Sequence, residues 1–192
     1  MNQRVAFISG SGRNIGRAIA LELAKSGCSV IINGSRDHAA GAAVVEEVKS
    51  LGVDSIYVGG SVGDADDVRR MAGEALEHFK AVNIVVNNAS IRPQTPFADL
   101  SEDEWHHVLG VDLHSAFYTA KAFSPAMIDG GWGRIVNLTG MNAMHGYAMR
   151  PHVSVSKHGL WGLTKSLAKE FGPHGVTAVS YTHLTLPTTP YV

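Results

Sequence analysis

The sequence predicts a single α/β domain built on a doubly wound, mostly parallel sheet. Short runs rich in β-branched residues alternate along the chain with longer segments of helical periodicity. The short runs are apolar throughout, which is typical of parallel strands covered by helices on both faces. A chain of 192 residues can bury one substantial core without disulfides or a metal. We therefore expect a Rossmann-like domain that ends at about its sixth strand.

Each expected strand is a short apolar run. These runs lie at residues 4–9, 29–33, 55–59, 83–87 and 134–138, and a sixth is expected to end at residue 179. After the first strand, residues 14–26 have helical periodicity and stop at Gly27, a typical helix C-cap. Ser101 with Glu104 three residues later indicates another helix start. Pro125 and the glycines that follow it indicate where the helical region before the fifth strand ends.

The end of the sequence differs from the rest. From Ser180 onward it reads SYTHLTLPTTPYV, with four threonines, two prolines and no helical or alternating pattern. This stretch resembles translated adapter sequence, and a genuine disordered C-terminus is the alternative. We expect the folded domain to occupy residues 1–179 and residues 180–192 to be a non-native or disordered tail.

The composition narrows the class of protein. Sixteen basic and seventeen acidic side chains give a formal net charge of −1, which does not favour nucleic acid or an anionic membrane surface as a partner. The single cysteine, Cys28, lies in an apolar stretch and fits a packing role in a reducing compartment. No apolar run approaches the roughly 20 residues of a membrane span. We expect a soluble, cytoplasmic protein that acts on a small molecule.

The segment ISGSGRNIG, after the first expected strand, is the first candidate site. Small residues let the backbone approach a pyrophosphate, and the N–H groups at the start of the next helix point toward it. The glycine spacing does not match G-x-G-x-x-G, so the strand before the loop and the helix after it carry the prediction. We expect a nucleotide cofactor to bind this loop through Gly10, Ser11, Gly12, Arg13, Asn14, Ile15 and Gly16.

Several motifs together resemble one family, the short-chain dehydrogenases/reductases. SGSGRNIG is similar to the family's T-G-x-x-x-G-x-G, and NNAS at 87–90 is similar to its N-N-A-G. With RIVNLTG and SKHGLWGLTKSLAKEFGPHGVTA, the resemblance spans residues 4–179. It implies hydride transfer between NAD(P)(H) and a carbonyl or alcohol, and it adds Asn88 and Ala89 to the cofactor-binding residues. Asn14 replaces a family glycine, but asparagine tolerates positive φ, so we expect cofactor binding to be retained.

The charges near the second strand indicate the cofactor. Family members that prefer NAD carry an aspartate at the end of this strand, where Gly34 stands here. Arg13 and Arg36 could instead bind a 2′-phosphate, so we expect NADP(H) to be favoured over NAD(H). Two solvated surface arginines are the alternative. The family's adenine-contacting aspartate is replaced by Ser61, which Val62 follows, and we expect both to line the cofactor site.

The catalytic positions depart from the family pattern. In the family a tyrosine acts as acid/base, and a lysine one turn later binds the nicotinamide ribose and lowers the tyrosine's pKa. A serine orients the carbonyl, and an asparagine holds a relay water. The resemblance places Lys157 at the lysine position, but Val153, Gly140 and Asp112 stand at the tyrosine, serine and asparagine positions. Because Gly140 and Val153 keep the family's interval of thirteen, the alignment has not slipped.

Two residues in the segment 140–152 are candidate replacements for the lost acid. His145 supplies an imidazole, and Tyr147 supplies a phenol. We expect Lys157, His145 and Tyr147 to form the catalytic set, whereas the alternative is that the last two only shape the pocket. A non-catalytic cofactor-binding module or partner subunit is the alternative function. No histidines have a metal-ligand spacing such as H-E-x-x-H, so we expect no metal.

The resemblance also bears on completeness and assembly. Family members continue beyond GVTA into a substrate-covering segment and a seventh strand, so the resemblance implies a domain that is incomplete at its C-terminus. The family commonly pairs through the two helices that flank the fifth strand, which is compatible with a homo-oligomer.

Overall fold

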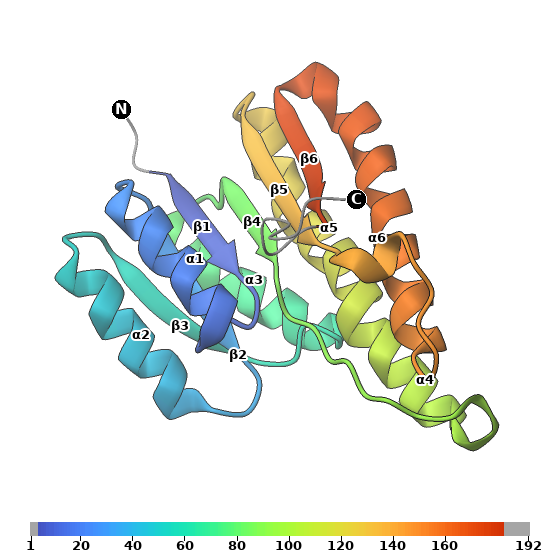
Figure 1. Ribbon diagram of the computed structural model, residues 1–192. Coiled ribbons are helices and arrows are strands. Elements are labelled where there is room, and N and C mark those ends of the chain that lie inside the picture. The colour runs from blue at the N-terminus through green and yellow to red at the C-terminus, as the bar shows by residue number, and fades with distance from the viewer. Residues whose placement is uncertain (1–3, 183–192) are drawn as a thin grey trace, which may run out of the picture.

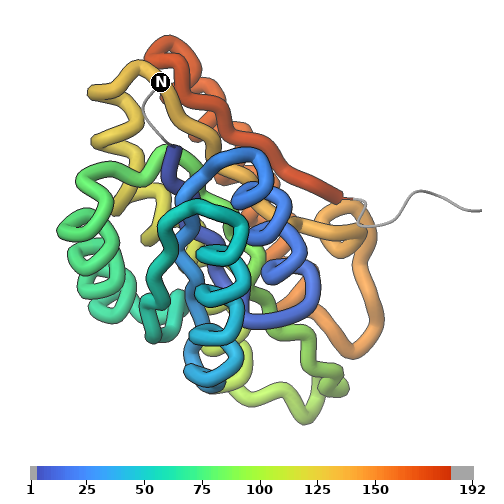
Figure 2. The backbone as a smooth tube through the Cα atoms, turned by 90° about the vertical axis from the view of Figure 1, so that its left-hand side faces the viewer, coloured from blue at the N-terminus to red at the C-terminus, as the bar shows by residue number. Residues whose placement is uncertain are grey.

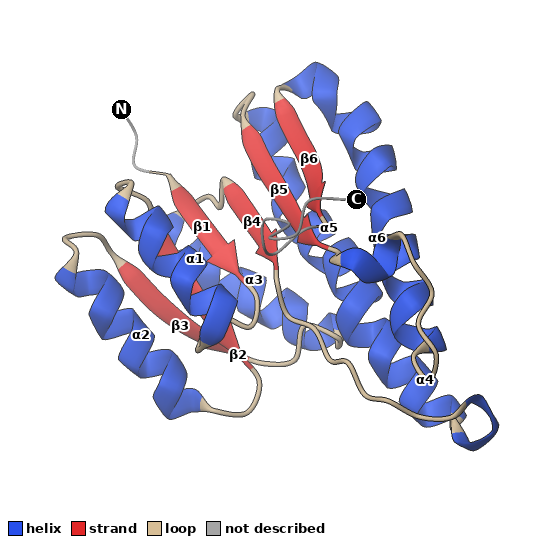
Figure 3. Ribbon diagram, viewed as in Figure 1, coloured by secondary structure: helices blue, strands red, loops and turns tan. Residues whose placement is uncertain are grey.

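The computed structural model describes residues 4–182, which form a three-layer α/β domain (Figure 1). Six parallel strands make one sheet in the order β3-β2-β1-β4-β5-β6, and their arrows point to the same edge (Figure 3). The predicted doubly wound parallel sheet is confirmed. The strands are β1 Val5–Ile8, β2 Ser29–Gly34, β3 Ser55–Gly59, β4 Ile84–Asn87, β5 Gly133–Leu138 and β6 Val176–Tyr181.

Helices cover both faces of this sheet. The α1–α2 pair packs on one face, against one side of β1 and β2, while α3, α5 and the end of α6 pack on the other (Figures 1 and 2). The α-helices are α1 Asn14–Lys25, α2 His38–Ser50, α3 Ala65–Phe79, α4 Glu102–Leu109, α5 Ser115–Asp129 and α6 Pro151–Phe171. A π-helical turn at Gly110–His114 joins α4 to α5, and short 3-10 turns lie at Phe97–Asp99, Met141–Ala143 and Gly172–His174.

The local signals for helix ends are mostly confirmed. Gly27 follows the last turn of α1 with a φ of +85°, a conformation in which glycine carries no Cβ penalty. Ser101 caps α4 by accepting the N–H of Glu104. Pro125, however, lies inside α5, which continues to Asp129. Pro125 is exposed, so water can reach the carbonyl that loses its helical partner there.

The sixth strand extends beyond the expected boundary at residue 179. Ser180 and Tyr181 continue β6 and pair with the last two residues of β5. The carbonyl oxygen of Tyr181 also accepts the N–H groups of Thr139 and Gly140, each at 3.1 Å. The expectation that the domain stops at 179 is therefore wrong by two residues, because a ladder needs backbone groups and not an apolar pattern. The rest of the expected tail, residues 183–192, lies outside the described residues.

Two further observations concern residues 4–182 as a whole. No helix in this part of the chain is both long enough and apolar enough to cross a bilayer. No three His, Cys, Asp or Glu side chains in the same range are grouped so that they could hold a metal ion.

Cys28 is buried in the core between the sheet and the α1–α2 pair, and this burial raises the pKa of its thiol.

Candidate functional site

A cavity of about 810 Å³ opens at the carboxyl ends of the strands, around the reversal of strand order between β1 and β4. Lys157 lines it, as does every predicted cofactor-binding residue except Ser11: Gly10, Gly12, Arg13, Asn14, Ile15, Gly16, Arg36, Ser61, Val62, Asn88 and Ala89. The same space therefore joins the glycine loop to the lysine of the catalytic motif.

Ser11 has a structural place in the loop. It is fully buried, its hydroxyl donates to the carbonyl oxygen of Ile8 at 2.7 Å, and it accepts the N–H of Asn33 at 3.0 Å. Gly16 shows why the loop needs small residues, because a Cβ there would lie 2.4 Å from the carbonyl oxygen of Gly10. The loop is therefore folded tightly on itself, which leaves its outer backbone free to face the cavity.

The first turn of α1 presents unpaired N–H groups to the cavity. Asn14 adopts the positive φ expected for it, +50°. It lines the cavity with Ile15 and Gly16, no side chain caps the helix, and no acidic residue lies in its first turn. The positive end of the helix dipole is thus open to an anion such as a phosphate.

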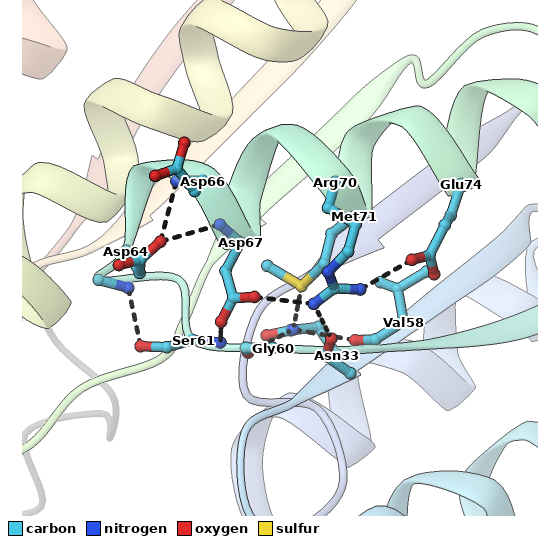
Figure 4. Close-up of polar contacts among 12 residues, drawn as sticks. Asn33, Val58, Gly60, Ser61, Asp64, Asp66, Asp67, Arg70, Met71 and Glu74 are labelled. Carbon is cyan, nitrogen blue, oxygen red and sulfur yellow. Dashed lines mark hydrogen bonds and ion pairs between the residues drawn. The ribbon is translucent and has the colours of Figure 1, made fainter.

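Asn33, which the sequence reasoning missed, ties the glycine loop to the loop after β3. Its Oδ1 accepts the N–H of Gly10 at 3.2 Å, and its Nδ2 donates to the carbonyl oxygens of Val58 and Gly60 at 3.1 and 3.2 Å (Figure 4). The side chain is buried, so these bonds satisfy an amide that would otherwise be costly to desolvate. A polar residue near the end of an otherwise apolar strand was the signal.

The loop after β3 is held by a charged network. The N–H of Ser61 donates to Asp67 Oδ2 at 2.8 Å, and Arg70 contacts Asp67 Oδ1 at 2.8 Å and the carbonyl oxygen of Gly59 at 2.7 Å (Figure 4). The hydrogen bond from Arg70, followed by that from Ser61, lowers the pKa of the Asp67 carboxyl. The backbone of Ser61 is therefore fixed at the wall of the cavity, which Ser61 and Val62 both line.

The N-N-A-S segment locks the glycine loop onto β4. Asn88 Nδ2 donates to the carbonyl oxygens of Ser9 and Gly10 at 2.9 and 3.0 Å. The Ser9 hydroxyl in turn accepts the N–H groups of Asn88 and Ala89, both at 3.0 Å. Asn88 and Ala89 thus lie beside the glycine loop, and these hydrogen bonds hold the loop and the N-N-A-S segment together.

Lys157, on α6, lies in a buried polar cluster at the other end of the cavity. The residue is 5% exposed, and its Nζ donates to the carbonyl oxygen of Leu138 at 3.1 Å and lies 3.4 Å from Asp112 Oδ2. Asp112 also accepts the Ser90 hydroxyl at 2.6 Å and the N–H of Ile91 at 2.8 Å. The position that reads as a lost asparagine in the sequence therefore supplies a counter-charge to the lysine.

This environment sets the protonation of the lysine. Burial lowers the pKa of Lys157 below its ordinary value, and the charge of Arg92 acts in the same direction. The charge of Asp112 and its hydrogen bond oppose both effects and raise the pKa. The result is an amine whose proton is held less tightly than that of an exposed lysine, beside a cavity able to take a ligand.

The tyrosine and the serine that the family uses are absent from their positions in this chain. Val153 is 0% exposed and carries no polar group. Gly140 has φ +66° and ψ −179°, a region that is essentially restricted to glycine, so a serine could not take its place without strain. His145 and Tyr147 are exposed and do not line the cavity. The structure brings Lys157 to the cofactor-binding residues but does not bring these two there.

Several lining residues were missed by sequence reasoning. Ser90 is the last residue of the N-N-A-S segment, and Ile91 and Arg92 follow it directly, so extending the motif could have found all three. His107 and Asn142 line the cavity from α4 and from the turn at Met141–Ala143, and no local pattern marks them. Their placement depends on how separate elements pack.

Comparisons with known proteins agree with this geometry. A family model described as short chain dehydrogenase matches residues 4–188. The 3-oxoacyl-[acyl-carrier-protein] reductase FabG of Staphylococcus aureus is 37% identical over 174 residues, which are 90% of this chain and 70% of the relative. The corresponding reductase of Synechocystis sp. is 34% identical over 177 residues, covering 92% and 72%. A metagenomic short-chain oxidoreductase solved with NADP superposes with a TM-score of 0.90 at 28% identity, covering 95% of this chain and 82% of that one. This chain belongs to the short-chain dehydrogenase/reductase family of oxidoreductases.

Proposed function

We propose that this protein transfers hydride between NADP(H) and a carbonyl or alcohol substrate. The observation that carries the proposal is the cavity that joins the glycine loop to Lys157. Its volume of about 810 Å³ lies within the range of small-molecule sites. The loop would hold the pyrophosphate, and Lys157 would lie at the reacting end.

The charges around the cavity support NADP(H) as the cofactor. Arg13 and Arg36 line it, and neither has an ion-pair partner among residues 4–182. Gly34 offers no carboxylate to ribose hydroxyls, and the neighbouring Asp37 instead caps α2 by accepting the N–H of Ala40 at 2.9 Å. Two guanidinium groups that form no ion pair with a carboxylate favour a 2′-phosphate. The structural neighbour that was solved with NADP is consistent with this choice.

Lys157 is the residue best placed to move a proton. Bound NADPH supplies a hydride, so the reduction of a carbonyl also requires a proton on the oxygen. The Lys157 ammonium has three N–H donors, of which one contacts Leu138 and a second is directed by the charge of Asp112. The third can donate to the carbonyl oxygen, which leaves a neutral amine that water reprotonates. The lowered pKa of Lys157 makes this transfer easier than from an ordinary lysine.

His145 and Tyr147 remain candidates for part of the acid/base work. Their exposed positions outside the cavity make Lys157 the stronger candidate. The absence of a phenol at Val153 and of a hydroxyl at Gly140 favours a second function, a cofactor-binding module that carries out no hydride transfer. Both functions require the cofactor, so cofactor binding and turnover have to be measured separately.

The test is a fluorescence titration with NADPH and NADH, followed by turnover on a panel of ketones, aldehydes and alcohols. Wild-type protein should bind NADPH more tightly and turn over at least one substrate. Lys157→Met should abolish turnover, whereas His145→Ala and Tyr147→Phe should each change it less than twofold. NADPH binding without turnover of any panel member would favour the module, and no binding of either cofactor would overturn both functions.

A further inference from the structure

Six arginines within residues 4–182 form no ion pair there: Arg4, Arg13, Arg36, Arg92, Arg134 and Arg150. Arg4 and Arg134 lie over the ring of Trp132, outside the cavity. Outside the cavity, Arg17, Arg69 and Arg70 each form an ion pair with a neighbouring carboxylate. The three arginines that line the cavity, which are Arg13, Arg36 and Arg92, have no such partner within residues 4–182. A 2′-phosphate accounts for the first two. Arg92 is left without an assigned partner.

Arg92 lies at the lysine end of the cavity. Its backbone is fixed through the preceding residues, because the Ser90 hydroxyl and the N–H of Ile91 both donate to Asp112. The same carboxylate lies 3.4 Å from Lys157 Nζ. One buried acid therefore positions both the lysine and the start of the segment that carries the arginine. Arg92 and Lys157 line the same cavity, and the charge of Arg92 contributes to lowering the pKa of Lys157.

The charge balance at this end is positive. Asp112 is buried, and its charge is matched by Lys157. Of the described residues that line the cavity, Asp37 is the only acid, and it lies beside Arg36 at the start of α2. An exposed guanidinium that shares a cavity wall with a catalytic lysine and lacks a carboxylate is suited to receive an oxyanion in a bidentate pair.

We propose that Arg92 forms a subsite for an anionic group, a carboxylate or a phosphate, on the substrate, so that the reacting carbonyl or alcohol lies at Lys157. The inference rests on the proposed function and names the substrate class for it: oxo or hydroxy compounds that carry an oxyanion. Binding energy from the charged group would position the reacting carbon, which is how remote contacts raise the rate of the chemical step.

The experiment compares each charged substrate with a neutral counterpart of the same skeleton. The pairs are pyruvate and methyl pyruvate, acetoacetate and methyl acetoacetate, and dihydroxyacetone phosphate and dihydroxyacetone. Wild-type kcat/KM should favour the charged member of at least one pair by about tenfold or more, as a charge-assisted pair allows. Which pair shows the preference tells whether the subsite binds a carboxylate or a phosphate. The preference for the charged substrate should shrink as salt is added.

Arg92→Gln should remove this preference, mainly through KM, while the neutral member reacts as before. Arg69→Gln, an exposed arginine paired outside the cavity, is the control and should keep the preference. The Kd for NADPH should be unchanged in both variants. If Arg92→Gln instead weakens NADPH binding, the arginine belongs to the cofactor site and the inference is wrong. Equal rates for charged and neutral substrates in the wild type would also overturn it.

Failure of the proposed function is distinguishable from failure of the subsite. If NADPH binds but nothing is turned over, calorimetric titration of the NADP⁺-saturated protein with pyruvate, acetoacetate, dihydroxyacetone phosphate and their neutral partners decides the question. Binding of an anion that Arg92→Gln removes and Arg69→Gln keeps would support the subsite without catalysis. No anion binding, or binding equal in both variants, would overturn the subsite.

Discussion

Lys157 Nζ lies 3.4 Å from Asp112 Oδ2, and both side chains are buried. The family resemblance places a neutral asparagine at the position of Asp112, so this chain combines an added negative charge with the loss of the phenol at Val153. A carboxylate beside a desolvated amine favours the ammonium form. The aspartate that replaces the family's asparagine at position 112 therefore favours the protonated form of Lys157.

Asp112→Asn should shift the pH dependence of reduction. The ammonium form of Lys157 is the proton donor, so the rate falls as pH rises through the pKa of Lys157. Asp112 raises that pKa against burial and Arg92, so its removal lowers the pKa and moves the falling limb of kcat to lower pH. Asp103→Asn, which removes an exposed carboxylate on α4, should leave the profile in place. A pH profile of kcat that is identical in wild type and Asp112→Asn would contradict the role given to Lys157.

Gly140→Ser should destabilise the protein and not simply restore the family's serine. No atom lies within 4 Å of a Cβ built there, so the cost comes from the backbone, whose φ of +66° and ψ of −179° suit only glycine. We expect a loss of about 1–3 kcal/mol in the free energy of unfolding, equal for Gly140→Ala. Gly146→Ser is the control, because its Cβ also meets nothing and its φ is not positive. Urea unfolding measures all three, and a Gly140→Ser variant as stable as wild type would show that the loop relaxes.

Arg36→Ala should weaken binding of NADPH and leave binding of NADH nearly unchanged. A charged hydrogen bond contributes about 1–3 kcal/mol, which corresponds to a rise of about 5- to 150-fold in the Kd for NADPH. Arg17→Ala removes a guanidinium from the same region, but one that pairs with Glu47 and does not line the cavity. It should change neither Kd. An equal loss for both cofactors in Arg36→Ala would mean that Arg36 does not contact a 2′-phosphate.

The fold was predictable because its signals are local. Buried parallel strands need apolar runs, and the first five strands fall on the five runs expected for them. The positive φ of Asn14 followed from the side chain that replaces a glycine in a tight loop. The glycine loop could likewise be placed from its flanking strand and helix, because a motif at the end of a strand is positioned by the sheet itself.

The lysine end of the site was less predictable because its contacts join distant segments. Asp112 reads as a lost residue in sequence, and its contact with Lys157 appears only when the π-helical turn packs against α6. The nearness of His145 and Tyr147 to the motif in sequence did not bring them to the cavity, because both lie exposed after the turn at Met141–Ala143. The sequence alone does not show that Arg92 lines the cavity, so its lack of an ion-pair partner could not be related to the site.

Truncation after Val179 should give a less stable protein than truncation after Thr182. The shorter chain loses Tyr181, whose carbonyl oxygen accepts the N–H groups of Thr139 and Gly140 and the Thr139 hydroxyl, each at 3.1 Å. Each of these three bonds contributes about 0.5–1.5 kcal/mol, so we expect a loss of roughly 1.5–4.5 kcal/mol in urea unfolding. Because Thr139 and Gly140 line the cavity, NADPH should also bind more weakly to the shorter chain. Equal unfolding midpoints for the two truncations would mean that the end of β6 does not support this wall of the site.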